Sequence, residues 1–418
     1  MITTMPVPRS CLLFLAGLLC LLTAGPALGA GDDRVFWVLD GEALGGYSKV
    51  EGTGGTGTSL NDWLVSPTVK LGDDLRWINV YNGSFNRAAQ VVAQEEGGRR
   101  SQTTQNHSLS TALKWNVSKS WSLRPLFFAD WVFVNETEDE SFGDGLYDYR
   151  DIGAGLESSW ITLETEGRRD EVRLGFRYLD REYPNYHSLL SLVLANPVET
   201  DEKDLEGYKI NLSKESRAKS DRSWGLEGIF FYKDYTDKKT IDRNGILQPG
   251  STREDLVGYL NGYVSGPLRP AWSWRLDGQL AANSSNLDYY DTHSTLTPAD
   301  DDFIKDYFDW VSVTVTPSLN YTRTLSEGKE LVCTVNYSFN ALLYPDRRVQ
   351  NTAGLYRSDK QRDYTHTVSG KIKVPLTKNV SWVGFASYTI ADSNQDFEQF
   401  YLYSYDRWVA VTGLAVQF

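Results

Sequence analysis

Apolar side chains recur at every second position of several segments, with charged, polar or small residues between them, so each segment would present one apolar and one more polar face as a strand. In the segment 172–178, Arg173 and Arg177 alternate with Val, Leu, Phe and Tyr, and the segment 272–282 repeats this pattern. Rings of charged side chains around a water-filled space select ions by sign. The spacing therefore favours a polar surface that sorts solutes over a group that makes or breaks bonds.

The sequence offers little for catalysis or metal binding. One His lies beside a Ser, in Asn106-His107-Ser108, but a nucleophile needs both a base and an orienting group in contact with it. The chain has only 4 His and 3 Cys, of which Cys333 alone lies beyond the N-terminal leader, so a zinc or haem site is not expected. We predict no catalytic residues, no metal, no cofactor and no enzymatic activity.

Period-2 alternation dominates the chain after the leader and predicts an all-β protein. Short connections are expected near 72–74, 118–120, 166–170, 217–223, 265–271, 326–329 and 376–379. Longer polar ones are expected near 51–60, 85–103, 136–148, 182–205, 237–253, 290–306, 346–362 and 393–400. This rhythm predicts a transmembrane antiparallel up-and-down β-barrel of about 16 strands, with roughly 14 to 18 as the range. A soluble sandwich array or propeller is the alternative.

Tryptophan recurs just after the short connections, and the aromatic girdle predicted from this position consists of Trp121, Trp224, Trp272 and Trp382. Indole has an apolar body and a polar N–H, which suits the boundary between lipid and water. Ordinary enrichment of aromatic residues in strands is the other interpretation.

The segment 407–418 alternates up to a terminal Phe418 and resembles the last strand of bacterial outer-membrane β-barrel proteins, with a porin-like size and no specific subfamily. The resemblance implies that Phe418 is an assembly signal read by the barrel-assembly machinery. It also implies a Gram-negative outer membrane, contacts with lipid and lipopolysaccharide, and both termini on the periplasmic side. A homo-oligomer or a periplasmic partner is compatible with it.

The N-terminus resembles a secretory signal peptide. Arg9 precedes the apolar segment 12–22, and small residues before Ala30 suit a cleavage site. We therefore divide the chain into a signal peptide, 1–29, and a single barrel domain, 30–418; a membrane anchor is the alternative for the leader.

The net charge of −13 argues against a nucleic-acid partner.

The face opposite the apolar one is expected to line the lumen. The predicted pore-lining residues are Arg124, Arg173, Arg177, Arg275, Lys371, Lys373, Asp130, Glu157, Glu227 and Asp277. Basic residues outnumber acidic ones among them, which predicts a mild preference for anions. Pairing of these charges across strands is the competing interpretation.

These expectations favour a water-filled channel for small polar solutes, anionic ones among them. An export conduit for a polymer or partner protein, and a structural or adhesive surface barrel with a plugged lumen, are the alternatives.

The apolar segment 187–195 within the loop 182–205 could fold into the pore or cap the loop. Acidic loop runs, as at 136–140, 199–204 and 300–302, lack calcium-loop spacing and are expected to be solvated, with divalent-cation binding as the alternative.

Overall fold

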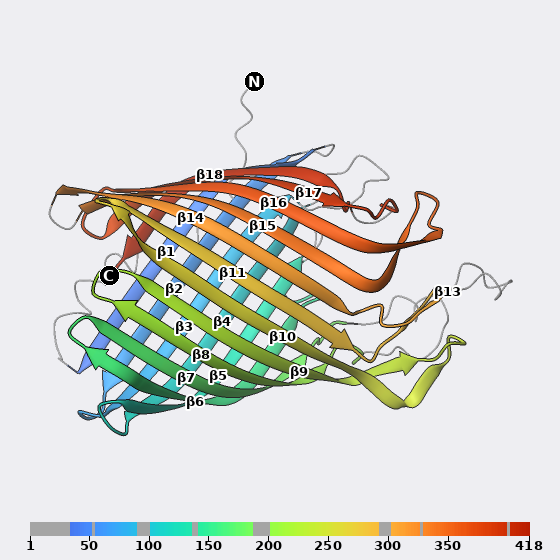
Figure 1. The fold of residues 1–418 in the computed structure, drawn as a ribbon, viewed down its shortest axis with the longest axis horizontal. Helices are drawn as coiled ribbons and strands as arrows, with labels where there is room; N and C mark the ends of the chain where they lie inside the picture. Colours follow the sequence, from blue (N-terminus) through green and yellow to red (C-terminus); the bar gives the residue numbers. More distant parts are fainter. Residues whose placement is uncertain are drawn as a thin grey trace.

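The computed structural model describes residues 34–51, 55–89, 101–135, 141–186, 201–291, 302–326, 329–398 and 402–418. In this part of the chain, strands close into one antiparallel barrel (Figure 1), which confirms the predicted 16-strand fold. The predicted leader, 1–29, lies outside the described residues. No helix in the described part has the length and hydropathy to cross a membrane.

The barrel strands follow chain order, and β1 pairs with β18 to close the wall. Their bounds are β1 (Val35–Val50), β2 (Thr56–Lys70), β3 (Leu75–Ala89), β4 (Ser101–Asn116), β5 (Trp121–Asn135), β6 (Tyr149–Thr165), β7 (Arg168–Glu182), β8 (Leu205–Ala218), β9 (Ser223–Ile241), β10 (Leu247–Arg269), β11 (Trp272–Ser285), β14 (Trp310–Ser326), β15 (Lys329–Gln350), β16 (Tyr356–Pro375), β17 (Val380–Ser393) and β18 (Tyr405–Gln417). A separate two-stranded sheet, β12 (Tyr289–Asp291) with β13 (Asp302–Ile304), lies in the connection between β11 and β14.

The first and last strands are joined along most of their length. Their register runs from Asp40 opposite Gln417 to Val50 opposite Arg407. Backbone hydrogen bonds also link Leu39 to Phe418, at 3.1 and 2.8 Å, so the terminal residue is part of the closure. A sheet closed in this way leaves no unpaired edge.

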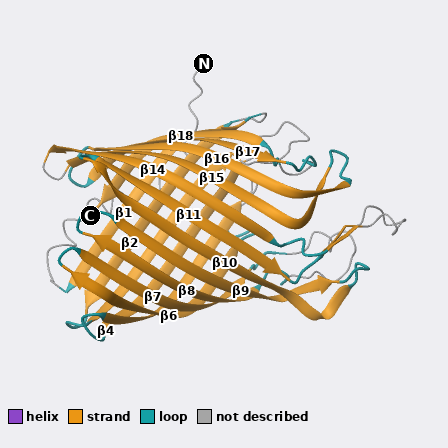
Figure 2. Ribbon diagram, viewed as in Figure 1, coloured by secondary structure: helices purple, strands orange, loops and turns teal. Residues whose placement is uncertain are grey.

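Two connections predicted as loops consist mostly of strand. The segments 237–253 and 346–362 extend β9–β10 and β15–β16 as long hairpins beyond the barrel, on the side of the longer connections (Figures 1 and 2). Both tips use the same turn: the carboxylate of Asp242 and the amide oxygen of Asn351 each accept two backbone N–H groups. Gly245 and Gly354 then take positive φ values of 76° and 80°.

The two faces of the wall differ in composition. Large apolar side chains are exposed on the outer face, with Phe127 at 66%, Phe230 at 62% and Leu212 at 55%. The inner face is mostly polar, but an apolar cluster at the seam of β1, β17 and β18 contains Leu44, Val383, Val411 and Ala415. Because both faces of this seam are apolar, the rule that the lumen face is the polar one does not hold here.

Candidate functional site

Strand alternation places all ten predicted pore-lining residues opposite the exposed apolar side chains, on the inner face of the wall. On β7, for example, Leu174 and Phe176 are exposed outside at 45% and 46%, so Arg173 and Arg177 point inward. The role of these side chains in conduction stays a prediction.

Several of the inner basic side chains are paired with carboxylates. Arg124 binds Glu157 across strands at 2.6 Å, and Arg275 binds Asp277 on its own strand at 2.6 Å. Further pairs on the inner face are Arg173–Glu171, Arg181–Asp151, Arg217–Glu215, Arg253–Asp255 and Lys371–Glu42. The sequence prediction of a basic lumen omitted several of these carboxylates, so the described inner face is closer to neutral than we expected.

A hollow of about 460 Å³ lies against the inner face of β8 to β11 and β14. At its centre, the Tyr263 hydroxyl donates to Glu215 at 2.7 Å, and the Arg275 guanidinium lies 4.1 Å from the Tyr263 ring centroid. A Cβ at Gly225 would lie 2.4 Å from the Tyr263 ring, so glycine allows this ring to lie flat on the wall. The arrangement can bind polar groups without carrying a large net charge.

A second hollow, of about 670 Å³, lies along β1 to β6 and β16. Its carboxylates come from Asp40, Glu42, Asp62, Asp130 and Asp151, and its amines from Lys371 and Lys373. The Lys371 ammonium donates to both oxygens of Glu42, at 2.8 and 2.7 Å. Of the predicted residues, Asp130, Lys371 and Lys373 thus share one hollow, whereas Arg173, Glu227, Arg275 and Asp277 belong to the other.

The wall formed by β14 and β15 is lined mainly by hydroxyl and amide groups. Thr316 donates to Ser338 at 3.0 Å, and Asn340 donates to Ser312 and Thr314 at 3.0 and 2.8 Å. These groups satisfy one another across neighbouring strands while leaving a neutral polar surface. The lumen therefore has an uncharged sector beside a sector of paired charges.

His107 and Ser108 lie on opposite faces of the wall. The His107 ring lies outside with Tyr81, whose hydroxyl is 2.7 Å from Nδ1. Ser108 lies inside and hydrogen bonds to Asp130. The pair therefore cannot act as base and nucleophile on one substrate. Among the described residues, no group of three or more His, Cys, Asp or Glu is placed to hold a metal ion.

The predicted girdle residues lie on the outer face close to the short turns. Trp121 and Trp272 are the first residues of β5 and β11, Trp224 is the second residue of β9, and Trp382 is the third residue of β17. The Trp121 indole donates to Ser158 at 2.8 Å. This placement suits a girdle, but contact with a membrane interface stays a prediction.

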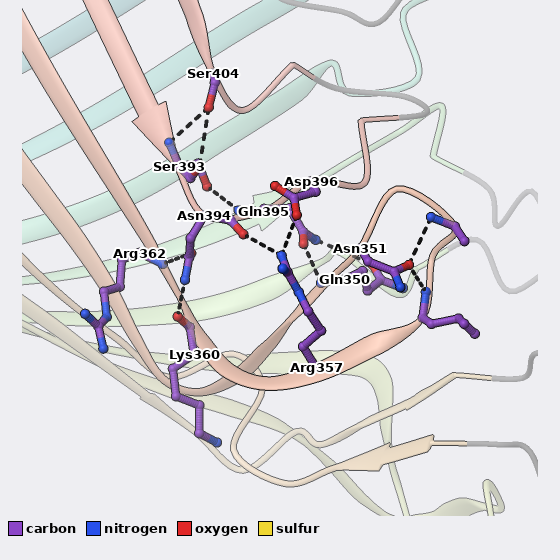
Figure 3. A network of polar contacts seen from close by, with 12 residues as sticks. Gln350, Asn351, Arg357, Lys360, Arg362, Ser393, Asn394, Gln395, Asp396 and Ser404 are labelled. Carbon is purple, nitrogen blue, oxygen red and sulfur yellow. Dashed lines mark hydrogen bonds and ion pairs between the residues drawn. The ribbon is translucent and has the colours of Figure 1, made fainter.

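Polar contacts fix the long connections at the other end. In Figure 3, Asn394 accepts the backbone N–H of Arg362 and donates to the carbonyl of Lys360, both at 2.8 Å. Arg357 binds Asp396 at 2.5 Å in the same network, so the β17–β18 connection is attached to the β15–β16 hairpin. The segment 187–195, proposed to fold inward, and the acidic residues at 136–140 and 300–301 lie outside the described residues.

Partly buried titratable groups lie at the bases of these connections. Asp309, just before β14, accepts the backbone N–H of Ser285 at 2.7 Å, and burial raises the pKa of its carboxyl above the usual value. The Lys203 ammonium lies 5.2 and 4.8 Å from the ring centroids of Tyr147 and Tyr186, and burial lowers its pKa. Both groups titrate away from their ordinary range because the folded connections exclude water from them.

The chain matches no family model and no curated protein. Solved structures with a similar fold include OprB of Pseudomonas putida, at 8% identity and TM-score 0.48, with 95% of this chain and 96% of that chain covered. They also include OccAB1 of Acinetobacter baumannii, at 12% identity and TM-score 0.45, covering 92% and 96%. A bacterial polysaccharide outer-membrane secretin matches at 10% identity and TM-score 0.45, covering 93% and 100%. These neighbours are bacterial outer-membrane β-barrels, and the likeness concerns the fold alone.

Proposed function

We propose that the protein is an outer-membrane channel for the diffusion of small polar solutes. The observation that supports it most is the division of one closed wall into an exposed apolar outer face and a polar inner face. A soluble protein rarely exposes large contiguous apolar patches. A 16-strand barrel is also too wide for side chains alone to fill its interior.

The paired charges and the neutral sector of β14 and β15 support passage of hydrated, polar solutes rather than strong selection by charge. Groups that are already hydrogen bonded can exchange contacts with a passing solute at small net cost. We orient the short turns toward the periplasm and the long connections toward the outside, as is usual for barrels of this kind. The expected partners are therefore lipid and lipopolysaccharide.

Planar-bilayer recording of the refolded protein tests the channel. We expect stable, ohmic steps in KCl, and a shift of electrophoretic mobility between unheated and boiled samples as the control for folding. A folded barrel that gives no conductance would contradict the proposal. Deletion of 187–200 then tests whether this segment plugs the lumen. A large rise in conductance would favour the plugged-barrel alternative. Unchanged conductance would favour an open lumen.

A further inference from the structure

Three inner cations that are neighbours on the wall lack an ion pair in the part of the chain that the structure describes. Arg177, Lys209 and Lys233 lie on the adjacent strands β7, β8 and β9, and no carboxylate oxygen lies within 4.0 Å of their charged nitrogens. This separates them from Arg124, Arg173, Arg181, Arg217, Arg253, Arg275 and Lys371, each of which is paired.

The register brings the three cations together. Arg177 is directly opposite Lys209 across β7 and β8. Lys209 is directly opposite Phe231, and Lys233 lies two residues along β9 on the same face. Directly opposed side chains have Cβ atoms about 5 Å apart, and diagonal ones about 7–8 Å apart. Like charges at this spacing repel each other, and an anion bound between them would offset that repulsion.

Aromatic rings lie close to the cationic groups of Arg177 and Lys233 on the wall. The Arg177 guanidinium lies 6.0 Å from the Phe128 ring centroid, and the Lys233 ammonium lies 5.2 Å from that of Phe231. A ring face attracts a cation but leaves its N–H groups able to donate to a ligand. The cations are thus positioned without being neutralised.

The nearby carboxylates are already engaged. Asp130 is hydrogen bonded to Ser108, and Glu227 accepts from Asn261 at 3.3 Å. Asp255, which stands opposite Lys233, accepts from Arg253 at 2.9 and 2.8 Å. These acids reduce the local potential but do not occupy the donors of the three cations.

We propose that Arg177, Lys209 and Lys233 form a binding site for small oxyanions, carboxylates or phosphates, on the lumen wall. A guanidinium fork and two ammonium groups match the geometry and charge of such anions. The inference rests on the proposed channel, for which it supplies an anion-binding step. It replaces the generally basic lumen predicted from the sequence with one local anion-binding site.

Binding of inorganic phosphate to the folded barrel in detergent tests the site directly, by calorimetry at constant ionic strength. We expect saturable binding to the unmodified protein, weakened about tenfold or more by Arg177→Gln or Lys209→Gln. Lys209→Arg keeps the charge and should keep most of the affinity. The matched control is Lys373→Gln, which removes one inner positive charge from a distant strand, and it should leave binding unchanged.

Absence of phosphate binding, or an equal loss in Lys373→Gln, would overturn the site. Mobility before and after boiling shows whether each variant is folded, and Lys209→Gln is the second variant if Arg177→Gln does not fold. In bilayers, phosphate should reduce the chloride current of the unmodified protein but not of Lys209→Gln. Phosphate binding without conductance would support the binding site and contradict the proposed channel. Conductance without phosphate binding would support the channel and contradict the binding site.

Discussion

The side chain of Arg177 lies against the backbone of Gly155, its direct neighbour across β6 and β7. A Cβ at position 155 would lie 2.9 Å from Cγ of Arg177 and 2.7 Å from the carbonyl oxygen of Phe176. Glycine therefore lets the arginine lie along the wall toward Phe128 instead of extending into the lumen.

Gly155→Ala should displace Arg177 and destabilise the barrel by about 1–3 kcal/mol, because the added methyl group overlaps a backbone oxygen that cannot move freely. The free energy of unfolding in urea, measured in lipid vesicles, checks this. Gly228→Ala is the matched control, since a Cβ there meets no atom within 4 Å. Equal stability of the two variants would show that the contact at position 155 is not restrictive.

The tips of the two long hairpins depend on glycine. Gly245 and Gly354 have φ values of 76° and 80°, where an L-residue costs about 1–2 kcal/mol. Gly354→Ala should open its tip and speed cleavage there by a protease, with little change in global unfolding because the tip lies beyond the barrel. Gly250→Ala, in the other hairpin, has no positive φ and no close neighbour and should be cleaved as in the unmodified protein.

The strands of the barrel follow from local sequence patterns, whereas the side-chain pairs on its inner face do not. Alternation and the succession of short and long connections were sufficient to predict the strand number. The hairpin tips also had a local signal that was missed, an Asp or Asn three residues before Gly, at Asp242 and Asn351.

The pairs on the inner face depend on register and curvature. Lys371 and Glu42 are distant in sequence, and two strands separate them around the barrel. Nothing in the period-2 pattern brings them together. For the same reason, the inner faces of β1, β17 and β18 were expected to be polar, although Leu44 packs there against Val383 and Val411. Alternation along a strand indicates which face of the wall a residue occupies, but not which side chains lie beside it.

The base of the β11–β14 connection should become more stable as the pH falls. Burial raises the pKa of Asp309, so the folded state binds more protons than the unfolded state between the ordinary value, 3.8, and the raised one. Stability is thus fully present below 3.8 and decreases as the pH rises through the raised pKa. Hydrogen exchange at Ser285, corrected for its intrinsic pH dependence, should slow on acidification from neutral pH.

Asp309→Asn is the control for this effect, because an amide oxygen can still accept the Ser285 N–H at 2.7 Å without carrying a charge. Exchange at Ser285 should then be as slow at pH 7 as in the acidified unmodified protein, and nearly independent of pH. An unmodified protein whose exchange at Ser285 quickens on acidification would contradict the sign of the shift.

The Arg124–Glu157 pair provides a test of how far pairing neutralises the lumen. Glu157→Gln leaves Arg124 without its carboxylate, which lies 2.6 Å away in the unmodified protein. One unit charge about 8 Å from a passing ion in water changes the energy of that ion by about 0.5 kcal/mol. Chloride gains this energy and potassium loses it, so the chloride-to-potassium permeability ratio, obtained from the reversal potential in a KCl gradient, should rise about fivefold.

The double variant Arg124→Gln with Glu157→Gln removes both charges and should restore the ratio of the unmodified protein. Arg124→Gln alone should lower the ratio by a similar factor, because Glu157 then faces the lumen without its partner. Opposite shifts in the two single variants, with their cancellation in the double variant, would show that the pair lies on the ion path. Single variants that leave the reversal potential unchanged would place the conducting path away from β5 and β6 and would count against a lumen lined by this part of the wall.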